Sequence, residues 1–91
     1  MNKETFKIKS GYVSREVAGE LLAIPVDPEL SSSSIVILNP VSGLLWEKLQ
    51  NESTIPELVK SVLEEFAIDE VTAESDIKEF LQMLEESNML E

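Results

Sequence analysis

The first third of the chain has the alternating pattern of short β-strands. Residues 12–17 mix β-branched and polar positions, and residues 21–26 alternate their larger apolar side chains between two faces. Residues 35–38 form a short run that is apolar on both faces. The connections between these segments are too short for crossover helices, which predicts a three-stranded antiparallel meander. Pro25 has no N–H to give to a ladder, so strand pairing is expected to fail near it.

The remainder of the chain has helical spacing in three segments. Asn39 is a favoured N-cap residue followed by Pro40 at the first helical position, which predicts a helix up to about residue 50. Thr54 opens a capping-box pattern, and a second helix is expected behind it. The third helix is expected to begin at Asp69 or Thr72. Its predicted core-facing residues are Ile77, Phe80, Leu81 and Leu84.

This order of elements, strands first and helices after, predicts an α+β fold with the helices packed on one face of a small sheet. The 91 residues are enough for a single domain, 1–91, with one core. Met89 and Leu90 are expected to pack back against that core as a short tail. Residues 27–34, which include four consecutive serines, are typical of a solvated loop.

The charge is unevenly distributed along the chain, whose net charge is −11. Residues 1–15 carry four bases and one acid, whereas the remaining residues carry three bases and seventeen acids. Nucleic-acid binding depends on the neutralisation of phosphates by bases, and an acidic body repels them. The composition therefore predicts that nucleic acid is not a partner.

Candidate chemistry is scarce. The chain contains neither His nor Cys, which excludes the commonest general base, a catalytic triad and thiolate ligands. Most carboxylates fall off the apolar stripes, as in a solvated face, and the isolated glycines make no phosphate-binding loop. We therefore expect no catalytic residue, no metal and no cofactor. No apolar run approaches the ~20 residues that span a bilayer, and no signal peptide is evident, which predicts a cytoplasmic protein without a membrane partner.

What remains is binding. Residues 35–38 end the meander, so that this strand is expected to have one unpaired edge, which could accept a peptide as an additional strand. Alternatively, the third helix or a second copy of the chain covers the edge. Met83 lies beside the core stripe of the third helix. It belongs either to the fringe of the core or to a surface that accepts varied side chains.

Several segments, taken in order, resemble the PqqD family, which is named for the pyrroloquinoline quinone biosynthesis protein D. Its members are peptide-recognition elements for ribosomally made, post-translationally modified peptides. The resemblance covers residues 8–91 and rests on order and spacing rather than on one motif. The segments are Val13-Ser14-Arg15-Glu16-Val17, Ile37-Leu38-Asn39, Gly43-Leu44-Leu45-Trp46, Thr54-Ile55-Pro56-Glu57-Leu58-Val59, and Asp76-Ile77 with Phe80-Leu81, Leu84 and Met89-Leu90.

The resemblance implies a winged helix-turn-helix-like fold with a three-stranded antiparallel sheet followed by three helices. It also implies binding of a precursor peptide's leader, antiparallel to the third strand. The family presents this leader to a modifying enzyme, such as a radical S-adenosylmethionine enzyme, a leader peptidase or a cyclase. The family's peptide-binding positions fall here on Ile35, Val36, Ile37, Leu38, Asp76, Glu79, Phe80 and Met83. The long 27–34 connection departs from the family pattern and could alter one end of the groove.

Two other functions are compatible with such a fold. Winged helix-turn-helix domains often bind DNA, but this needs bases on the recognition helix, and the third helix here has Lys78 as its only base. A structural homodimerisation domain would use the same edge strand.

Overall fold

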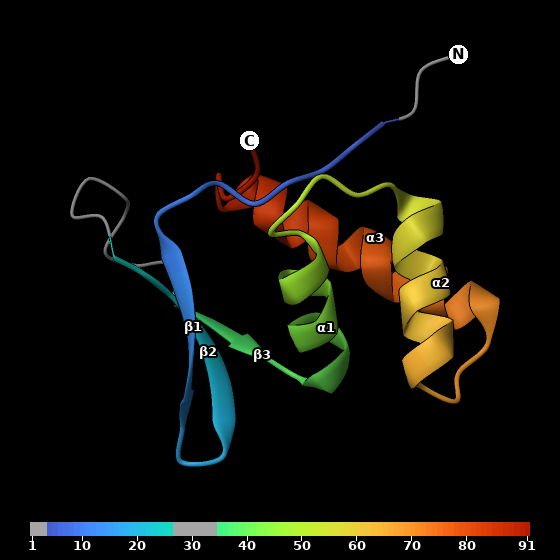
Figure 1. The fold of residues 1–91 in the computed structure, drawn as a ribbon, viewed down its shortest axis with the longest axis horizontal. Coiled ribbons are helices and arrows are strands. Elements are labelled where there is room, and N and C mark those ends of the chain that lie inside the picture. The colour runs from blue at the N-terminus through green and yellow to red at the C-terminus, as the bar shows by residue number, and fades with distance from the viewer. Residues whose placement is uncertain (1–3, 27–34) are drawn as a thin grey trace.

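Three antiparallel strands precede three helices in a computed structural model that describes residues 4–26 and 35–91. The helices lie to one side of the sheet (Figure 1), which confirms the predicted α+β class and strand meander. The strands, in sheet order, are β1 (Tyr12–Val17), β2 (Glu20–Pro25) and β3 (Val36–Leu38). The helices are α1 (Pro40–Lys48), α2 (Ile55–Glu65) and α3 (Glu70–Glu86).

A two-residue turn joins β1 to β2. Ala18 and Gly19 both have positive φ, 54° and 84°, as a type I′ turn requires. The residues that flank such a turn, here Val17 and Glu20, exchange both of their backbone hydrogen bonds. Because the bonded side alternates along a strand, the even-numbered residues of β2 bond to β1. The backbone groups of its odd-numbered residues face β3.

This alternation determines which side of β3 is bonded. Leu21 and Ala23 are paired in register with Leu38 and Val36, so these pairs exchange the hydrogen bonds between β2 and β3. The N–H and C=O of Ile37, which lies between them, therefore point away from the sheet. β3 is the last strand in the sheet order, and its outer edge is formed by these groups.

The predicted boundaries of three elements differ from the structure. β2 runs from Glu20 to Pro25, whereas the sequence predicted residues 21–26. β3 begins at Val36, whereas the sequence predicted Ile35 as the first residue of this strand. Pro25 is the next residue of β2 whose backbone faces β3, and it has no N–H with which to extend the ladder. α1 ends at Lys48, somewhat before the predicted residue 50. The predicted loop 27–34 lies outside the described residues.

The core lies between the inner face of the sheet and the helices. Ala23 of β2 and Leu38 of β3 are buried there, and the ring of Tyr12 packs edge-on against Trp46 with centroids 6.0 Å apart. The predicted stripe of α3 is confirmed as part of this core. Its buried members are Ile77, Phe80, Leu81 and Leu84.

The segment just before β1 and the residues after α3 lie together beside the helices (Figure 1). Ile8, only 2% exposed, pairs with Leu90 in an isolated bridge, and Phe6 pairs with Ser53 in another. Met89 is fully buried, which confirms the predicted packing of the tail. The contribution of the segment before β1 was not predicted, because single apolar residues among lysines have no strand periodicity.

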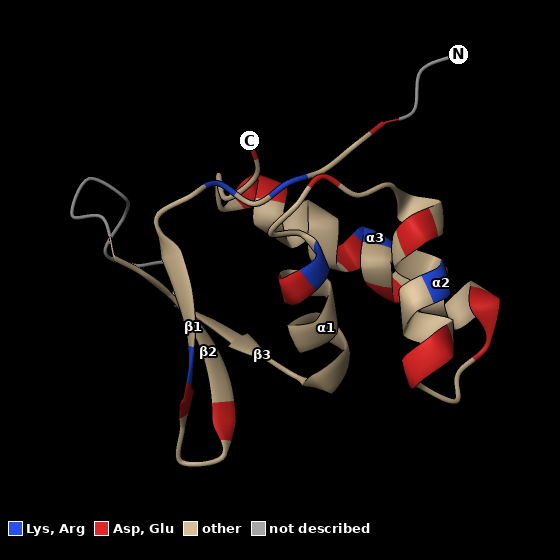
Figure 2. Cartoon of the chain, in the orientation of Figure 1, with Lys and Arg blue, Asp and Glu red and all other residues tan. Residues whose placement is uncertain are grey.

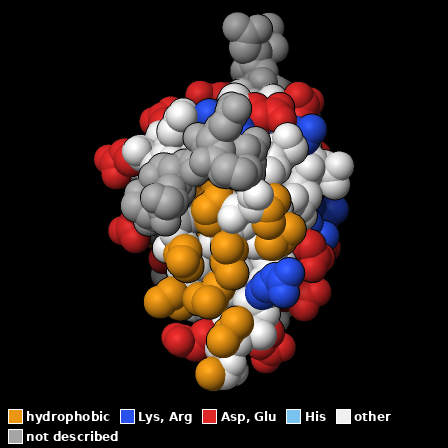
Figure 3. All heavy atoms as spheres, turned by 90° about the vertical axis from the view of Figure 1, so that its left-hand side faces the viewer, with side chains coloured by type: hydrophobic (Ala, Val, Ile, Leu, Met, Phe, Trp, Pro, Cys, Tyr) orange, Lys and Arg blue, Asp and Glu red, His pale blue; other side chains and the backbone are white. Residues whose placement is uncertain are grey.

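The surface separates charged and apolar regions. Acidic side chains are spread over the helices (Figure 2), as expected for a solvated acidic face. The face of the sheet turned away from the helices is largely apolar (Figure 3). The alternation of side chains and the register of the strands define this outer face. Its apolar residues are Val13, Val17, Leu22, Ile24, Ile35 and Ile37, and its charged residues are Arg15 on β1 and Glu20 at the turn end of β2.

Side chains cap the helices at the predicted places. The N–H of Thr72 donates to Oδ1 of Asp69 over 2.9 Å, so that α3 begins after Asp69, one of its two predicted start positions. Hydrogen bonding from the Thr72 side chain, and then from its backbone, lowers the pKa of Asp69. At α2, the N–H of Thr54 donates to Oε1 of Glu57 over 2.8 Å, and the N–H of Glu57 donates to Oγ1 of Thr54 over 3.3 Å.

We expect the Thr54→Ala substitution to lower the free energy of unfolding by about 1 kcal/mol, because the first turn of α2 loses its cap acceptor. Urea denaturation measures this difference. The control is Thr54→Ser, which retains the hydroxyl and should lose much less. Equal midpoints for the alanine variant and the parent would show that the cap does not contribute.

Candidate functional site

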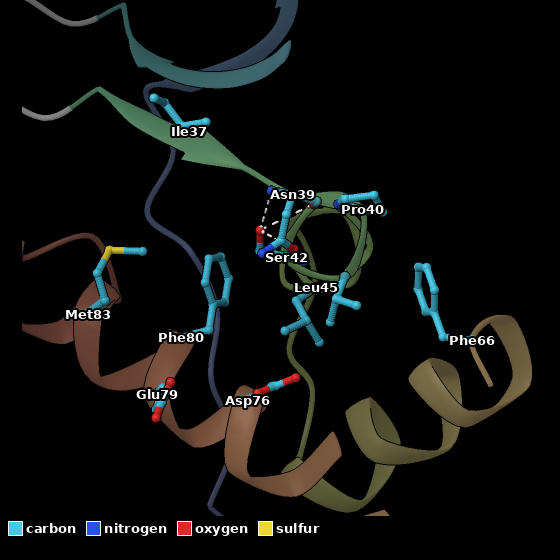
Figure 4. A pocket seen from close by; sticks show the side chains of 11 residues that line it. Ile37, Asn39, Pro40, Ser42, Leu45, Phe66, Asp76, Glu79, Phe80 and Met83 are labelled. Carbon is cyan, nitrogen blue, oxygen red and sulfur yellow. Dashed lines mark hydrogen bonds between the residues drawn. The ribbon is translucent and has the colours of Figure 1, made fainter. Parts of the chain in front are cut away.

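A groove separates the free edge of β3 from α3 (Figure 4). Its volume is about 570 Å³, and the N-terminus of α1 and the end of α2 close it at one side. The sequence alternative in which the third helix covers this edge is wrong, because the groove lies between the two. We call it the β3–α3 groove; its main lining residues are Ile37, Ser42, Phe66, Asp76, Phe80 and Met83.

The strand side of the groove has a short row of free backbone groups. Ile37 points its N–H and C=O outward, and Ile35 is the next residue in the same alternation. At the other end, the N–H of Asn39 donates to Oγ of Ser42 over 2.8 Å, and its C=O accepts from the N–H of Gly43 over 2.7 Å. The α1 cap thus uses the next outward groups, so that the free edge within the described residues is formed by Ile35 and Ile37.

The helix side of the groove is apolar with an acidic rim. Phe80 is only 8% exposed, and its ring points from α3 towards β3 (Figure 4). Met83, one turn further along, points towards the same strand and is half-buried. It both packs against the core, as one of the two interpretations from sequence predicted, and lines the groove. Asp76 and Glu79 are exposed on the same side of α3.

The structure brings together most of the residues that the family resemblance indicated. The backbone edge of Ile37 faces Phe80 and Met83 across the groove, and Asp76 and Glu79 line it as well. Ile35 lies immediately before β3 and is exposed.

The other two predicted positions face the interior. Val36 is half-buried against the core, and Leu38 is buried within it. The backbone groups of both residues bond to β2. They therefore hold the edge strand in place, while the groups that a ligand could reach belong to Ile35 and Ile37.

Several residues of the groove were not predicted as site residues. Ser42 and Leu45 come from α1, and Phe66 is the C-cap of α2. Phe66 remains partly exposed and faces the groove. The sequence did predict that a helix begins after Asn39. Because this helix follows the edge strand directly, its first turn could have been expected to border the site.

The groove has a negative rim. Within the described part of the chain the ion pairs are Lys7–Glu91 and Lys78–Glu74, so that Asp76 and Glu79 belong to neither. Their carboxylates flank the apolar lining of the groove. A cationic ligand side chain would therefore meet opposite charge here, and an anionic one would meet like charge.

We expect peptides with Lys or Arg at groove-facing positions to bind better than the same peptides with Asp or Glu there. The difference should appear mainly in the association rate and should shrink as salt is added. Stopped-flow measurements on a charge-reversal series, with Asp76→Asn and Glu79→Gln as matched variants, test this. A series without any charge preference would remove the electrostatic role of the rim.

The described residues contain no group of three or more His, Cys, Asp or Glu side chains that could hold a metal ion. Among the same residues, no helix is long and apolar enough to cross a membrane. The groove is lined by apolar side chains, the polar residues Asn39 and Ser42 of the α1 cap, free backbone groups and two rim carboxylates. These are groups for recognition of an extended chain by shape and hydrogen bonding.

Three antiparallel strands, three following helices and a groove beside the free edge define a domain of the winged helix-turn-helix-like class. The family model described as Coenzyme PQQ synthesis protein D (PqqD) matches residues 26–90. The chain therefore belongs to the PqqD family, as its sequence pattern predicted. No curated protein matches the chain.

Two solved structures have the same fold over nearly the whole chain. One is TbiB1 in complex with the TbiA(beta) leader peptide, with 25% identity, a TM-score of 0.72, and coverage of 93% of this chain and 94% of that chain. The other is lasso peptide synthetase B1 complexed with the leader peptide, with 16% identity, a TM-score of 0.73, and coverage of 94% and 96%. Their similarity confirms the predicted fold.

Proposed function

We propose that this protein binds the leader segment of a ribosomally made precursor peptide in the β3–α3 groove. The leader adds to the sheet as a strand antiparallel to β3. The observation that carries this proposal is the free backbone edge at Ile35 and Ile37, which faces a groove lined by Phe80 and Met83. The PqqD family match and the leader peptides named with both similar structures support it.

The two sides of the groove have different roles in this proposal. Main-chain hydrogen bonds to Ile35 and Ile37 supply affinity that depends little on the peptide's sequence. Side chains of the peptide that point into the groove meet Phe80, Met83 and the rim carboxylates, which select among sequences. Binding in an extended form holds the leader in one register, and the segment beyond it remains available to another protein.

The protein acts as an adaptor rather than a catalyst. It presents the precursor to a modifying enzyme, which we propose is a radical S-adenosylmethionine enzyme, a leader peptidase or a cyclase. The encounter takes place in the cytoplasm, where ribosomes make the precursor. The isolated protein should leave the mass of the precursor unchanged, and cleavage or modification by the purified protein alone would contradict an adaptor role.

Calorimetric titration tests the proposed binding, with the leader of the precursor encoded beside this protein's gene as ligand and a scrambled leader as control. We expect one leader per protein and no measurable heat from the scrambled peptide. Amide chemical shifts should change at β3 and along α3. Binding that shifts only resonances far from the groove would contradict the proposed site. Sedimentation of the free and bound protein distinguishes leader capture from homodimerisation through the same edge.

Met83→Ala should weaken leader binding by ~1–2 kcal/mol, because apolar surface covered by the peptide is lost. Its effect on stability should be small, since the side chain is only half-buried. Leu63→Ala on α2 is the control: Leu63 is an apolar residue that is 38% exposed and does not line the groove. Equal loss of affinity in both variants would show that the effect is not local to the groove.

A further inference from the structure

Two isoleucines of the free edge have side chains that the groove does not use. Ile35 is 57% exposed and Ile37 is 65% exposed. Ile37 belongs to the outer face, on the opposite side of the sheet from the core, and Ile35 follows the same alternation. Figure 3 shows the apolar side chains that gather on this face. Ile37 lies directly beside Leu22 of β2 in the register of the sheet, so that the apolar surface is continuous from β2 to the open edge.

A strand added at this edge would extend the outer face. The peptide residue opposite Ile37 would form a hydrogen-bonded pair with it, at a Cα separation of about 5.5 Å, and would place its side chain on the same face. The residue two positions further along an antiparallel peptide would stand beside Ile35 in the same way. The residues between and around them point into the groove instead.

We propose that the outer face is a second specificity surface, on which Ile37 and Ile35 select apolar side chains at two alternate positions of the bound peptide. This inference rests on the proposed strand addition at β3. The preferred residues are β-branched or aromatic, because these make the favourable cross-strand pairs with isoleucine. The ligand is thus an extended segment whose two faces are both recognised. Its apolar residues lie beside Ile35 and Ile37, and the residues between them point into the groove.

The charges near the outer face favour this apolar selection. The row that contains Ile37 continues through Leu22 to Arg15 on β1. At a strand spacing of about 4.8 Å, Arg15 is roughly 14 Å from an added strand, beyond the screening length of about 10 Å at 0.1 M salt. The residues of this row on the two strands nearest the peptide are therefore the apolar Ile37 and Leu22, and Arg15 lies on the third strand. The two faces of the bound peptide consequently contact different groups. The face in the groove lies near carboxylates, and the outer face lies beside isoleucines.

Selection of peptides from a random dodecapeptide display library tests the inference, with the parent protein and the Ile37→Lys variant as baits. For the parent, we expect apolar residues to be enriched at two peptide positions with one residue between them. For Ile37→Lys, we expect Asp or Glu at one of these two positions, with unchanged preferences at the groove-facing positions. Val17→Lys is the matched control, since it places a lysine on the same face two strands away, and its selected peptides should equal those of the parent.

The affinity of one selected peptide, measured by calorimetry, then quantifies the contribution of the outer face. Exchange of its outward apolar residue for Asp should reduce affinity for the parent by roughly fivefold, the upper value for a cross-strand pair, and should not reduce it for Ile37→Lys. Identical selections for the parent and Ile37→Lys would overturn the outer-face inference while the proposed function stands. If no peptide is enriched on the folded parent, strand addition itself fails, and the inference fails with it. An Ile37-dependent dimer with unchanged peptide preference would assign this face to a second copy and would also overturn the inference.

Discussion

Replacement of Ile37 by proline should abolish leader binding and leave the protein folded. Proline removes the outward N–H of this position and places its ring against the incoming strand. The peptide carbonyl that Ile37 would have paired then stays unsatisfied, at a cost of about 1–3 kcal/mol, to which the steric conflict of the ring adds. Proline is tolerated on an edge strand when its missing N–H faces solvent, so β3 should retain its place. Calorimetry and thermal unfolding of the same sample measure both quantities.

Three variants separate the backbone from the side chain. Ile37→Ala retains the N–H and should preserve most of the affinity. Ile35→Pro should behave as Ile37→Pro does, because its backbone faces the same side. Val36→Pro removes a hydrogen bond to Ala23 and should mainly destabilise the sheet. Parent-like affinity in a folded Ile37→Pro protein would exclude strand addition at this position.

The sequence alone does not show that the N–H and C=O of Ile37 point outward. The sequence indicated an edge strand but left open whether Ile35 and Ile37 or Val36 and Leu38 point their donors outward. That choice depends on the two-residue turn, where Ala18 has a positive φ that is uncommon for a residue other than glycine. The turn determines the bonded side of every residue in β2, and the register between β2 and β3 then determines it for β3.

Elements with strong local signals were predicted well. Caps such as Thr54 and Asp69 define helix starts through hydrogen bonds within a few residues, and periodicity identifies the buried face of α3. Residues that acquire a role through contacts between distant segments were missed. Phe66 faces the groove because α2 ends beside it, and Ile8 is buried because the two ends of the chain meet. Neither arrangement has a periodic signature in the sequence.

Leu84→Ala should produce a large loss of stability. Leu84 has no exposed surface and belongs to the stripe through which α3 contacts the core. Truncation removes three carbon atoms from a closely packed site and leaves a cavity that neighbouring side chains fill only in part. Buried Leu→Ala substitutions cost about 2–5 kcal/mol, a substantial fraction of the stability of a domain of this size. Urea denaturation with a two-state fit measures the change.

The adjacent residue provides the matched comparison, because Met83 and Leu84 are neighbours on the same helix but differ in exposure. Met83→Ala should leave the unfolding midpoint close to that of the parent and weaken leader binding. Leu84→Ala should lower the midpoint markedly, while the protein that remains folded binds the leader with an affinity close to that of the parent. Similar losses of stability in the two variants would place Met83 in the core. Similar losses of affinity would indicate that the groove requires the packing of the whole helix rather than the contacts of Met83.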